Sequence, residues 1–189
     1  DVLFGLGSAD TLNGGNGNDT LDGGSGVVNN VGDVLDGGAG TDTLSYASSA
    51  SGGVNVNLLT GAATGGDASG DVIANFENLT GSNHNDTLTG GALANVLIGG
   101  FGGAALAGGA GIDTASYVTS GSGVTVNLLT GAASGSDAAG DTLSSIENLI
   151  GSIHNDTLTG NALINTLWGG HGIDVLNGGD GSDILDGGT

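Results

Sequence analysis

The stretch GGNGNDTLDGG at residues 14–24 places five glycines and two aspartates around one large apolar residue, Leu21. Read in steps of nine from Gly14, it begins the pattern G-G-x-G-x-D-x-U-x, in which U is apolar. An internal repeat with a short fixed period is typical of a solenoid, in which each repeat stacks on its neighbours. The pattern returns as GGAGTDTLS at 37–45, GGHGIDVLN at 169–177 and GGDGSDILD at 178–186.

Each position of this nonapeptide has a separate structural role. Glycine tolerates positive φ angles, so it lets the backbone turn tightly with its carbonyl oxygens facing inward. Aspartate at position six adds an anionic oxygen beside those carbonyls, and Ca²⁺ prefers oxygen ligands of this kind in flexible turns. The last three residues are predicted to be extended, with the apolar residue of position eight pointing into the interior. The predicted apolar ladder consists of Leu12, Leu21, Leu35, Leu44, Leu88, Leu97, Leu158, Leu167, Leu176 and Leu185.

The charge of the chain also points to a bound cation. Its 189 residues include 20 acidic side chains and no Lys or Arg, which gives a formal net charge of -20. Carboxylates without cationic partners repel one another and oppose folding, so positive charge must come from outside the sequence. Phosphate binding needs Lys and Arg, which excludes nucleic acid as a partner. No apolar run is long enough for membrane insertion as a helix, and no cysteine offers a disulfide or a thiolate metal site.

These repeats resemble the RTX family of secreted calcium-binding proteins. The resemblance implies an all-β fold, a parallel β-roll or β-helix solenoid, in which two consecutive repeats form one coil. It also implies that each Ca²⁺ lies between the turns of adjacent coils on the same side. Asp residues 18 positions apart would then share ions, once the insertion VVNNV at 27–31 is discounted. The implied pairs are Asp1 with Asp19, Asp10 with Asp33, Asp19 with Asp42, and Asp156 with Asp174.

The candidate ligands for several Ca²⁺ ions occupy positions two, four and six of the repeats. The position-six residues are Asp1, Asp10, Asp19, Asp33, Asp42, Asp86, Asn95, Asp113, Asp156, Asn165, Asp174 and Asp183. The glycines are Gly15, Gly17, Gly24, Gly26, Gly38, Gly40, Gly109, Gly111, Gly170, Gly172, Gly179 and Gly181.

Several departures from the pattern predict weaker sites. Ala104 stands where Asp is expected opposite Asp86, and Asn95 and Asn165 offer only a neutral oxygen. The segment GLGSADTLN at 5–13 lacks two of the expected glycines, so Asp10 stands in a turn that fits the ligand pattern only loosely. The middle of the array is therefore predicted to bind calcium less well than either end.

A longer repeat contains the shorter one. The segment beginning VNVNLLTGAATGGDASGD at 54–90 returns at 124–160 as VTVNLLTGAASGSDAAGD, an offset of 70 residues. The alternating apolar residues of VNVNLL and VTVNLL predict strands. The spacers are therefore expected to extend the same parallel stack with longer coils. The predicted organisation is one continuous solenoid with an N-terminal roll at 1–36, RTX-plus-spacer units at 37–107 and 108–177, and a closing repeat at 178–189.

Other polar and aromatic residues have a structural and a functional interpretation. The spacer aspartates either bind an additional ion or, as is favoured, are ordinary loop residues; they are Asp67, Asp71, Asp137 and Asp141. Structural hydrogen bonds are predicted for Glu77 and Glu147. Four further aspartates are predicted to be either solvated or placed behind the ligands without binding the ion; they are Asp22, Asp36, Asp180 and Asp186. Since no Cys accompanies them, the histidines are interpreted as turn residues and not as zinc ligands; they are His84, His154 and His171.

The sequence predicts a secreted calcium-binding structural module and no enzyme, because no catalytic nucleophile motif is present. Metal binding and folding are expected to be one event, since a self-repelling chain cannot preform its sites. The favoured role is the repeat or scaffold region of an extracellular matrix, S-layer-type, filament or adhesin protein. The alternative is the C-terminal secretion and folding domain of a secreted protease, lipase or alginate epimerase. A minor alternative is a ligand- or ice-binding adhesin segment.

The resemblance further implies export by type I secretion and a location outside, or on the surface of, a Gram-negative bacterium. Solenoids need polar caps for solubility, and the sequence shows none. Besides calcium, the expected partners are therefore further copies in end-to-end assembly, or components of the cell surface or matrix.

Overall fold

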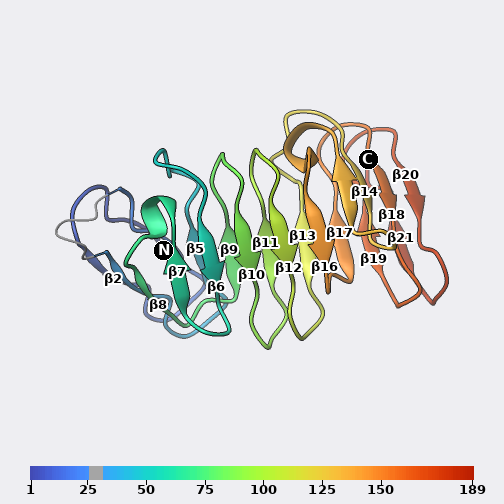
Figure 1. The fold of residues 1–189 in the computed structure, drawn as a ribbon. Coiled ribbons are helices and arrows are strands. Elements are labelled where there is room, and N and C mark those ends of the chain that lie inside the picture. Colours follow the sequence, from blue (N-terminus) through green and yellow to red (C-terminus); the bar gives the residue numbers. More distant parts are fainter. Residues whose placement is uncertain (26–31) are drawn as a thin grey trace.

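Short parallel strands form two faces of an elongated stack, and the chain crosses from one face to the other in each coil (Figure 1). A computed structural model describes residues 1–25 and 32–189. All of its strands are three residues long. The first face is a parallel sheet of nine strands, in the spatial order β1 (Val2–Phe4), β3 (Thr20–Asp22), β5 (Thr43–Ser45), β9 (Asn78–Thr80), β11 (Val96–Ile98), β13 (Thr114–Ser116), β17 (Asn148–Ile150), β19 (Thr166–Trp168) and β21 (Ile184–Asp186).

The second face consists of a three-stranded and a nine-stranded sheet, which meet where β8 lies beside β7. The three-stranded sheet contains β2 (Thr11–Asn13), β4 (Val34–Asp36) and β8 (Val72–Ala74). The nine-stranded sheet contains, in spatial order, β7 (Ala62–Thr64), β6 (Asn55–Asn57), β10 (Thr87–Thr89), β12 (Ala105–Ala107), β16 (Thr142–Ser144), β15 (Ala132–Ser134), β14 (Thr125–Asn127), β18 (Thr157–Thr159) and β20 (Val175–Asn177). Two short 3₁₀ helices precede β8 and β16; they are η1 (Gly66–Ala68) and η2 (Ser136–Ala138).

The core is a ladder of apolar residues from the middle of the strands. It contains most of the predicted leucines and others that the nonapeptide pattern did not identify, such as Leu79 and Leu106. On the first face Leu21 pairs with Leu44, and on the second Leu88 pairs with Leu106. Alternate residues of a strand point to opposite faces of the sheet, so the middle residue of each triplet is the one that is buried. The ladder is confirmed except at the margins, where Leu12 and Leu176 are half-buried. The prediction was wrong for Leu185, which is 47% exposed because β21 is an edge strand.

Both spacers join the same stack, but not as simple longer coils. VNVNLL and VTVNLL form β6 and β14 as predicted, and these strands pair in parallel with β10 and β18. Each is followed by a hairpin turn and an antiparallel strand, β7 or β15, which the sequence analysis did not predict. The turn is tight because Gly61, at φ 70°, lets its amide donate back to the Asn57 carbonyl at 2.9 Å. The spacer therefore doubles back once before the chain returns to the first face.

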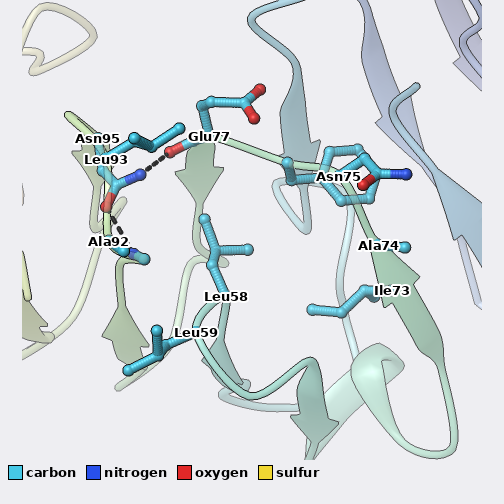
Figure 2. Close-up of a pocket in the computed structure, with 11 residues that line it drawn as sticks. Leu58, Leu59, Ile73, Ala74, Asn75, Glu77, Ala92, Leu93 and Asn95 are labelled. Atoms are coloured by element: carbon cyan, nitrogen blue, oxygen red, sulfur yellow. Dashed lines mark hydrogen bonds between the residues drawn. The ribbon is translucent and has the colours of Figure 1, made fainter. Parts of the chain in front are cut away.

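Each hairpin adds one strand to the second face. In the first unit a groove opens between the hairpin turn and the segment that leads from β8 into β9. This groove has a volume of about 220 Å³, and Leu58 and Leu59 of the hairpin turn are among the residues that line it (Figure 2). Its walls are mainly apolar, with Leu58, Ile73, Phe76 and Leu93 among them. A smaller groove of about 130 Å³ occurs at the matching place in the second unit, so both spacers have this groove.

Candidate metal sites

Two columns of turns run along the stack, one at each edge of the two faces. We call the turns that lead from the first face to the second the forward turns, and those that lead back the return turns. Glycines at positions two and four have positive φ angles, for example 97° at Gly38 and 151° at Gly40. Every predicted ligand glycine within the described residues has a positive φ, as expected for glycine in a tight turn. Gly26 and the insertion at 27–31 lie outside the described residues.

In the return turns, each position-six residue is bonded to the equivalent residue of the next coil. The Asp1 nitrogen donates to the Asp19 carboxylate, and the Asp19 amide donates to Oδ1 of Asp42 at 2.7 Å. Further along, the amides of Asn95 and Asn165 donate to Oδ1 of the next residue of the column, at 2.8 and 2.9 Å. Those acceptors are Asp113 and Asp183. Of the pairs predicted from sequence, Asp1 with Asp19 and Asp19 with Asp42 lie in this column and are brought together; that they share an ion stays a prediction.

The forward turns have the same series of hydrogen bonds from backbone amides to carboxylates. We call this series in each column a carboxylate ladder, and each of its positions a rung. The Asp10 amide donates to Oδ1 of Asp33 at 2.8 Å, and the Asp156 amide donates to Oδ1 of Asp174 at 2.8 Å. Ala104 has no carboxylate that could accept from the Asp86 amide, so the ladder is interrupted at this rung, as the sequence suggested.

Four spacer residues complete the two ladders, and the sequence analysis did not recognise them as rungs. The Asp42 and Asp113 amides donate to the carboxylates of Glu77 and Glu147, both at 2.8 Å. These bonds agree with the structural role predicted for the two glutamates. The Asp33 and Ala104 amides donate in the same way to the second aspartate of each spacer, at 2.8 and 2.7 Å. Those acceptors are Asp71 and Asp141.

A signal for these rungs is present in the sequence. GDVIA at 70–74 and GDTLS at 140–144 keep the D-x-U-x end of the nonapeptide without its glycines. ENLT at 77–80 keeps the same spacing with Glu in place of Asp. The position of the acid relative to the strand, rather than the glycine spacing, identifies a rung.

Several of these carboxylates are buried with one oxygen left without a donor. The Oδ2 atoms without a hydrogen-bond partner among the described residues belong to Asp10, Asp19, Asp42, Asp67, Asp113 and Asp174. Asp42 and Asp113 are completely buried. An uncompensated buried charge is strongly destabilising, and the sequence has no Lys or Arg to pair with it. A cation with a preference for oxygen ligands fits this donor set.

The first glycine of the repeat makes room for oxygens from two coils to converge. A Cβ on Gly14 would lie 2.7 Å from Oδ2 of Asp19 and 2.5 Å from the carbonyl oxygen of Gly37 in the next coil. A Cβ on Gly5 would likewise lie 2.9 Å from Oδ2 of Asp10 and 2.5 Å from the Gly23 carbonyl oxygen. The sequence analysis chose the glycines of positions two and four and missed this one. Carboxylate and carbonyl oxygens together suit Ca²⁺.

Among the described residues, no three His, Cys, Asp or Glu side chains form a metal-binding group by themselves. A calcium site in these turns must therefore use backbone carbonyl oxygens as well as carboxylates. His84 and His171 are exposed and His154 is half-buried. Of the two alternatives predicted for Asp22, the structure excludes the solvated one, because this residue is buried. Its Oδ1 accepts from the Gly24 amide at 2.9 Å and from Ser48 Oγ at 2.8 Å.

At the two asparagine rungs, the side-chain amide makes its hydrogen bonds within the protein. In Figure 2 the Asn95 side chain donates through Nδ2 to the Glu77 carbonyl oxygen, at 2.5 Å. Its Oδ1 accepts from the Gly91 amide at 2.6 Å. Asn165 makes the equivalent contact to the Glu147 carbonyl oxygen at 2.8 Å. Because both ends of the Asn95 amide are used within the protein, these contacts support the prediction of weaker sites at Asn.

Burial raises the pKa of several rung carboxyls above their ordinary value. For Asp33, Asp71 and Asp113 the main cause is desolvation, partly offset by the backbone amide that each carboxylate accepts. For Asp141 the same cause raises the pKa to about 6, with Asp137 and Asp86 adding repulsion. The ion-free fold therefore binds protons more readily than the unfolded chain does.

We expect acid to stabilise the ion-free fold partially. A carboxyl with a raised folded-state pKa stabilises the fold fully below the unfolded value, near 3.9, and this contribution is lost as pH rises through the folded value. For Asp141 the loss is centred near pH 6. Circular dichroism in calcium-stripped buffer should thus show more β structure at pH 5 than at pH 7.5. An equal or weaker β signal at pH 5 would contradict this expectation.

The fold and its turns together define a parallel β-solenoid whose coils are joined by buried, oxygen-rich acidic turns. The chain belongs to the RTX calcium-binding nonapeptide repeat family, which it matches in four copies over residues 1–27, 32–48, 80–115 and 159–189. It is thus a calcium-binding repeat module of the β-roll type. A search of curated proteins found no match. No helix in the described part of the chain is long and apolar enough to cross a membrane.

Proposed function

We propose that this chain is a secreted structural module that folds when it binds extracellular Ca²⁺. In this role it forms part of the scaffold of an extracellular matrix, S-layer-type, filament or adhesin protein at a bacterial surface. The observation that carries the proposal is the set of buried carboxylate oxygens without donors, which at Asp10 and Asp19 converge with a carbonyl oxygen of the next coil. Calcium supplies the positive charge that the sequence lacks.

The tandem architecture supports a scaffold role. The first unit passes into the second without a break, since β11 pairs with β13 and β12 pairs with β16. Both units bury the same residues at the same places, for example Tyr46 and Tyr117 at 2% exposure. In a solenoid each repeat contacts only its neighbours, so further units lengthen the stack without changing it. Such a unit suits a spacer or surface layer, where length is the useful property.

Calcium affinity and specificity test the binding half of the proposal. Titration calorimetry at pH 7.5 should show several Ca²⁺ bound per chain and little heat from Mg²⁺. The reason is that Mg²⁺ requires a tight octahedron and retains its waters, whereas these turns offer flexible carbonyl and carboxylate oxygens. Binding of Mg²⁺ as tight as that of Ca²⁺, or no Ca²⁺ binding, would contradict the proposal.

Fractionation of cells that produce the parent protein tests the scaffold half. Immunoblotting should find the exported protein in the surface or matrix fraction, and chelation should release it. Recovery of all exported protein as a soluble species in the medium would favour the alternative role as the tail of a secreted enzyme.

A further inference from the structure

The rung carboxylates differ in how many of their oxygens the protein itself satisfies. In the nonapeptide turns one oxygen accepts from the neighbouring rung and the other has no donor within the described residues, as at Asp42 and Asp113. In and beside the spacers, four rung carboxylates have donors for both oxygens. These four are Asp71, Asp86, Asp141 and Asp156.

A serine supplies the additional donors at two of these rungs. Oδ1 of Asp86 accepts from the Val54 amide at 2.7 Å and from Ser82 Oγ at 2.8 Å. Oδ2 accepts from the Ser82 amide at 2.7 Å. Three donor hydrogens thus occupy a carboxylate that has about four acceptor sites.

The second unit repeats this arrangement. Asp156 accepts from the Val124 amide at 2.7 Å and the Ser152 amide at 2.6 Å, with Ser152 Oγ at 3.0 and 3.1 Å from its two oxygens. Ser82 and Ser152 stand at position two of their turns, where several other repeats, for example at Gly38 and Gly170, have a glycine with positive φ. Neither serine has a positive φ. These two turns therefore follow a different path from those glycine turns, and the serine adds a hydroxyl donor.

A buried tyrosine performs the same task at the other two rungs. Tyr46 Oη donates to Oδ2 of Asp71 at 2.8 Å, and Tyr117 Oη donates to Oδ2 of Asp141 at 3.0 Å. Both tyrosines are only 2% exposed, and burial raises the pKa of each hydroxyl, so each hydroxyl keeps its proton and remains a donor. A donor hydrogen thus stands at the oxygen that the nonapeptide rungs leave without one.

We propose that the protein closes these four rungs with its own donors and that they take no Ca²⁺. Each spacer then joins the calcium-binding repeats through hydrogen bonds at these rungs, without a metal ion. Calcium binds only at the rungs with an unsatisfied oxygen. The inference rests on the proposed calcium-dependent function. It departs from the sequence analysis at Asp86 and Asp156, both of which the nonapeptide pattern identifies as ligands.

Counting bound ions by native mass spectrometry in calcium tests the inference. In turns with a positive-φ glycine at position two, such as Gly38, the position-two amide does not donate to Oδ2 of the position-six Asp. Ser82→Gly and Ser152→Gly allow this path of the turn, which takes the amide away from the carboxylate, and they also remove the hydroxyl. Each variant should therefore bind one more Ca²⁺ than the unaltered chain. Ser122→Gly is the matched control, because it places a glycine in an exposed turn position of the second unit and should leave the count unchanged. A count that does not rise in either serine variant overturns the inference.

Isosteric variants provide a second test if the glycine variants do not fold in calcium, as judged by circular dichroism. Asp86→Asn and Asp156→Asn should leave the ion count unchanged, whereas Asp42→Asn and Asp113→Asn should lower it by at least one. Loss of an ion from Asp86→Asn or Asp156→Asn overturns the inference. If the unaltered chain binds no Ca²⁺, the proposed function fails, which is a separate outcome.

Discussion

Removal of calcium is expected to convert the stack into an expanded coil and to abolish most of its β structure. The cause is electrostatic, because 20 acidic side chains without a single Lys or Arg remain in one chain once the ions leave. Buried rung carboxylates such as Asp42 and Asp113 then have neither a cation nor a second donor. In the unfolded chain they regain water, so the unfolded state is favoured.

The size of this effect follows from linkage between binding and folding. An ion that binds only the folded state stabilises it by about 2.7 kcal/mol when its free concentration is a hundredfold above Kd. A handful of such sites therefore matches the total stability of roughly 5–15 kcal/mol that is typical of a domain. Loss of the ions removes this stabilisation at every calcium-binding rung together.

Small-angle scattering and circular dichroism with and without a chelator check this expectation. The radius of gyration in chelator should approach about 46 Å, the value for an unfolded chain of this length. Addition of Ca²⁺ in excess of the chelator should restore the compact stack, whereas the same excess of Mg²⁺ should not. A β spectrum and radius that do not change in chelator would contradict coupled folding.

The sequence was sufficient to predict the parts of this fold that repeat. Position eight of the nonapeptide predicted the buried ladder that includes Leu21 and Leu44, because a period of nine places one inward residue in each strand. Position six predicted which residues share a column of turns. Both inferences succeed because neighbouring coils follow the same pattern, so residues at the same position of the repeat also contact one another in the stack.

The parts that depend on long-range contacts between different segments could not be predicted in this way. The antiparallel strand β7 has the sequence AAT, which shows no alternation of large apolar and polar residues. The bond from Tyr46 to Asp71 joins residues 25 positions apart and lies in no repeat period. Ser82 occupies a position where the repeat has glycine. Its hydrogen bond to Asp86 can be recognised only from the three-dimensional structure.

Where position two has the positive φ of the glycine turns, glycine is expected to be required for a steric reason as well as a conformational one. Two turns of the return column separate the two reasons. Gly15 and Gly38 have similar φ angles, 92° and 97°. A Cβ on Gly15 would meet nothing within 4 Å, whereas one on Gly38 would overlap the carbonyl oxygen of Gly15. Gly15→Ala therefore adds only backbone strain, of about 1–2 kcal/mol.

Gly38→Ala adds the same strain and also pushes adjacent turns apart. Overpacking of this kind costs about 1–3 kcal/mol further, because a backbone carbonyl cannot move aside as a flexible side chain can. The displaced carbonyl belongs to the column of turns that contains Asp19 and Asp42, so calcium binding there should weaken as well. Urea unfolding at a fixed calcium concentration should thus rank the variants as Gly15→Ala more stable than Gly38→Ala. Equal unfolding free energies for the two variants would show that close stacking of the turns is not what requires glycine at this position.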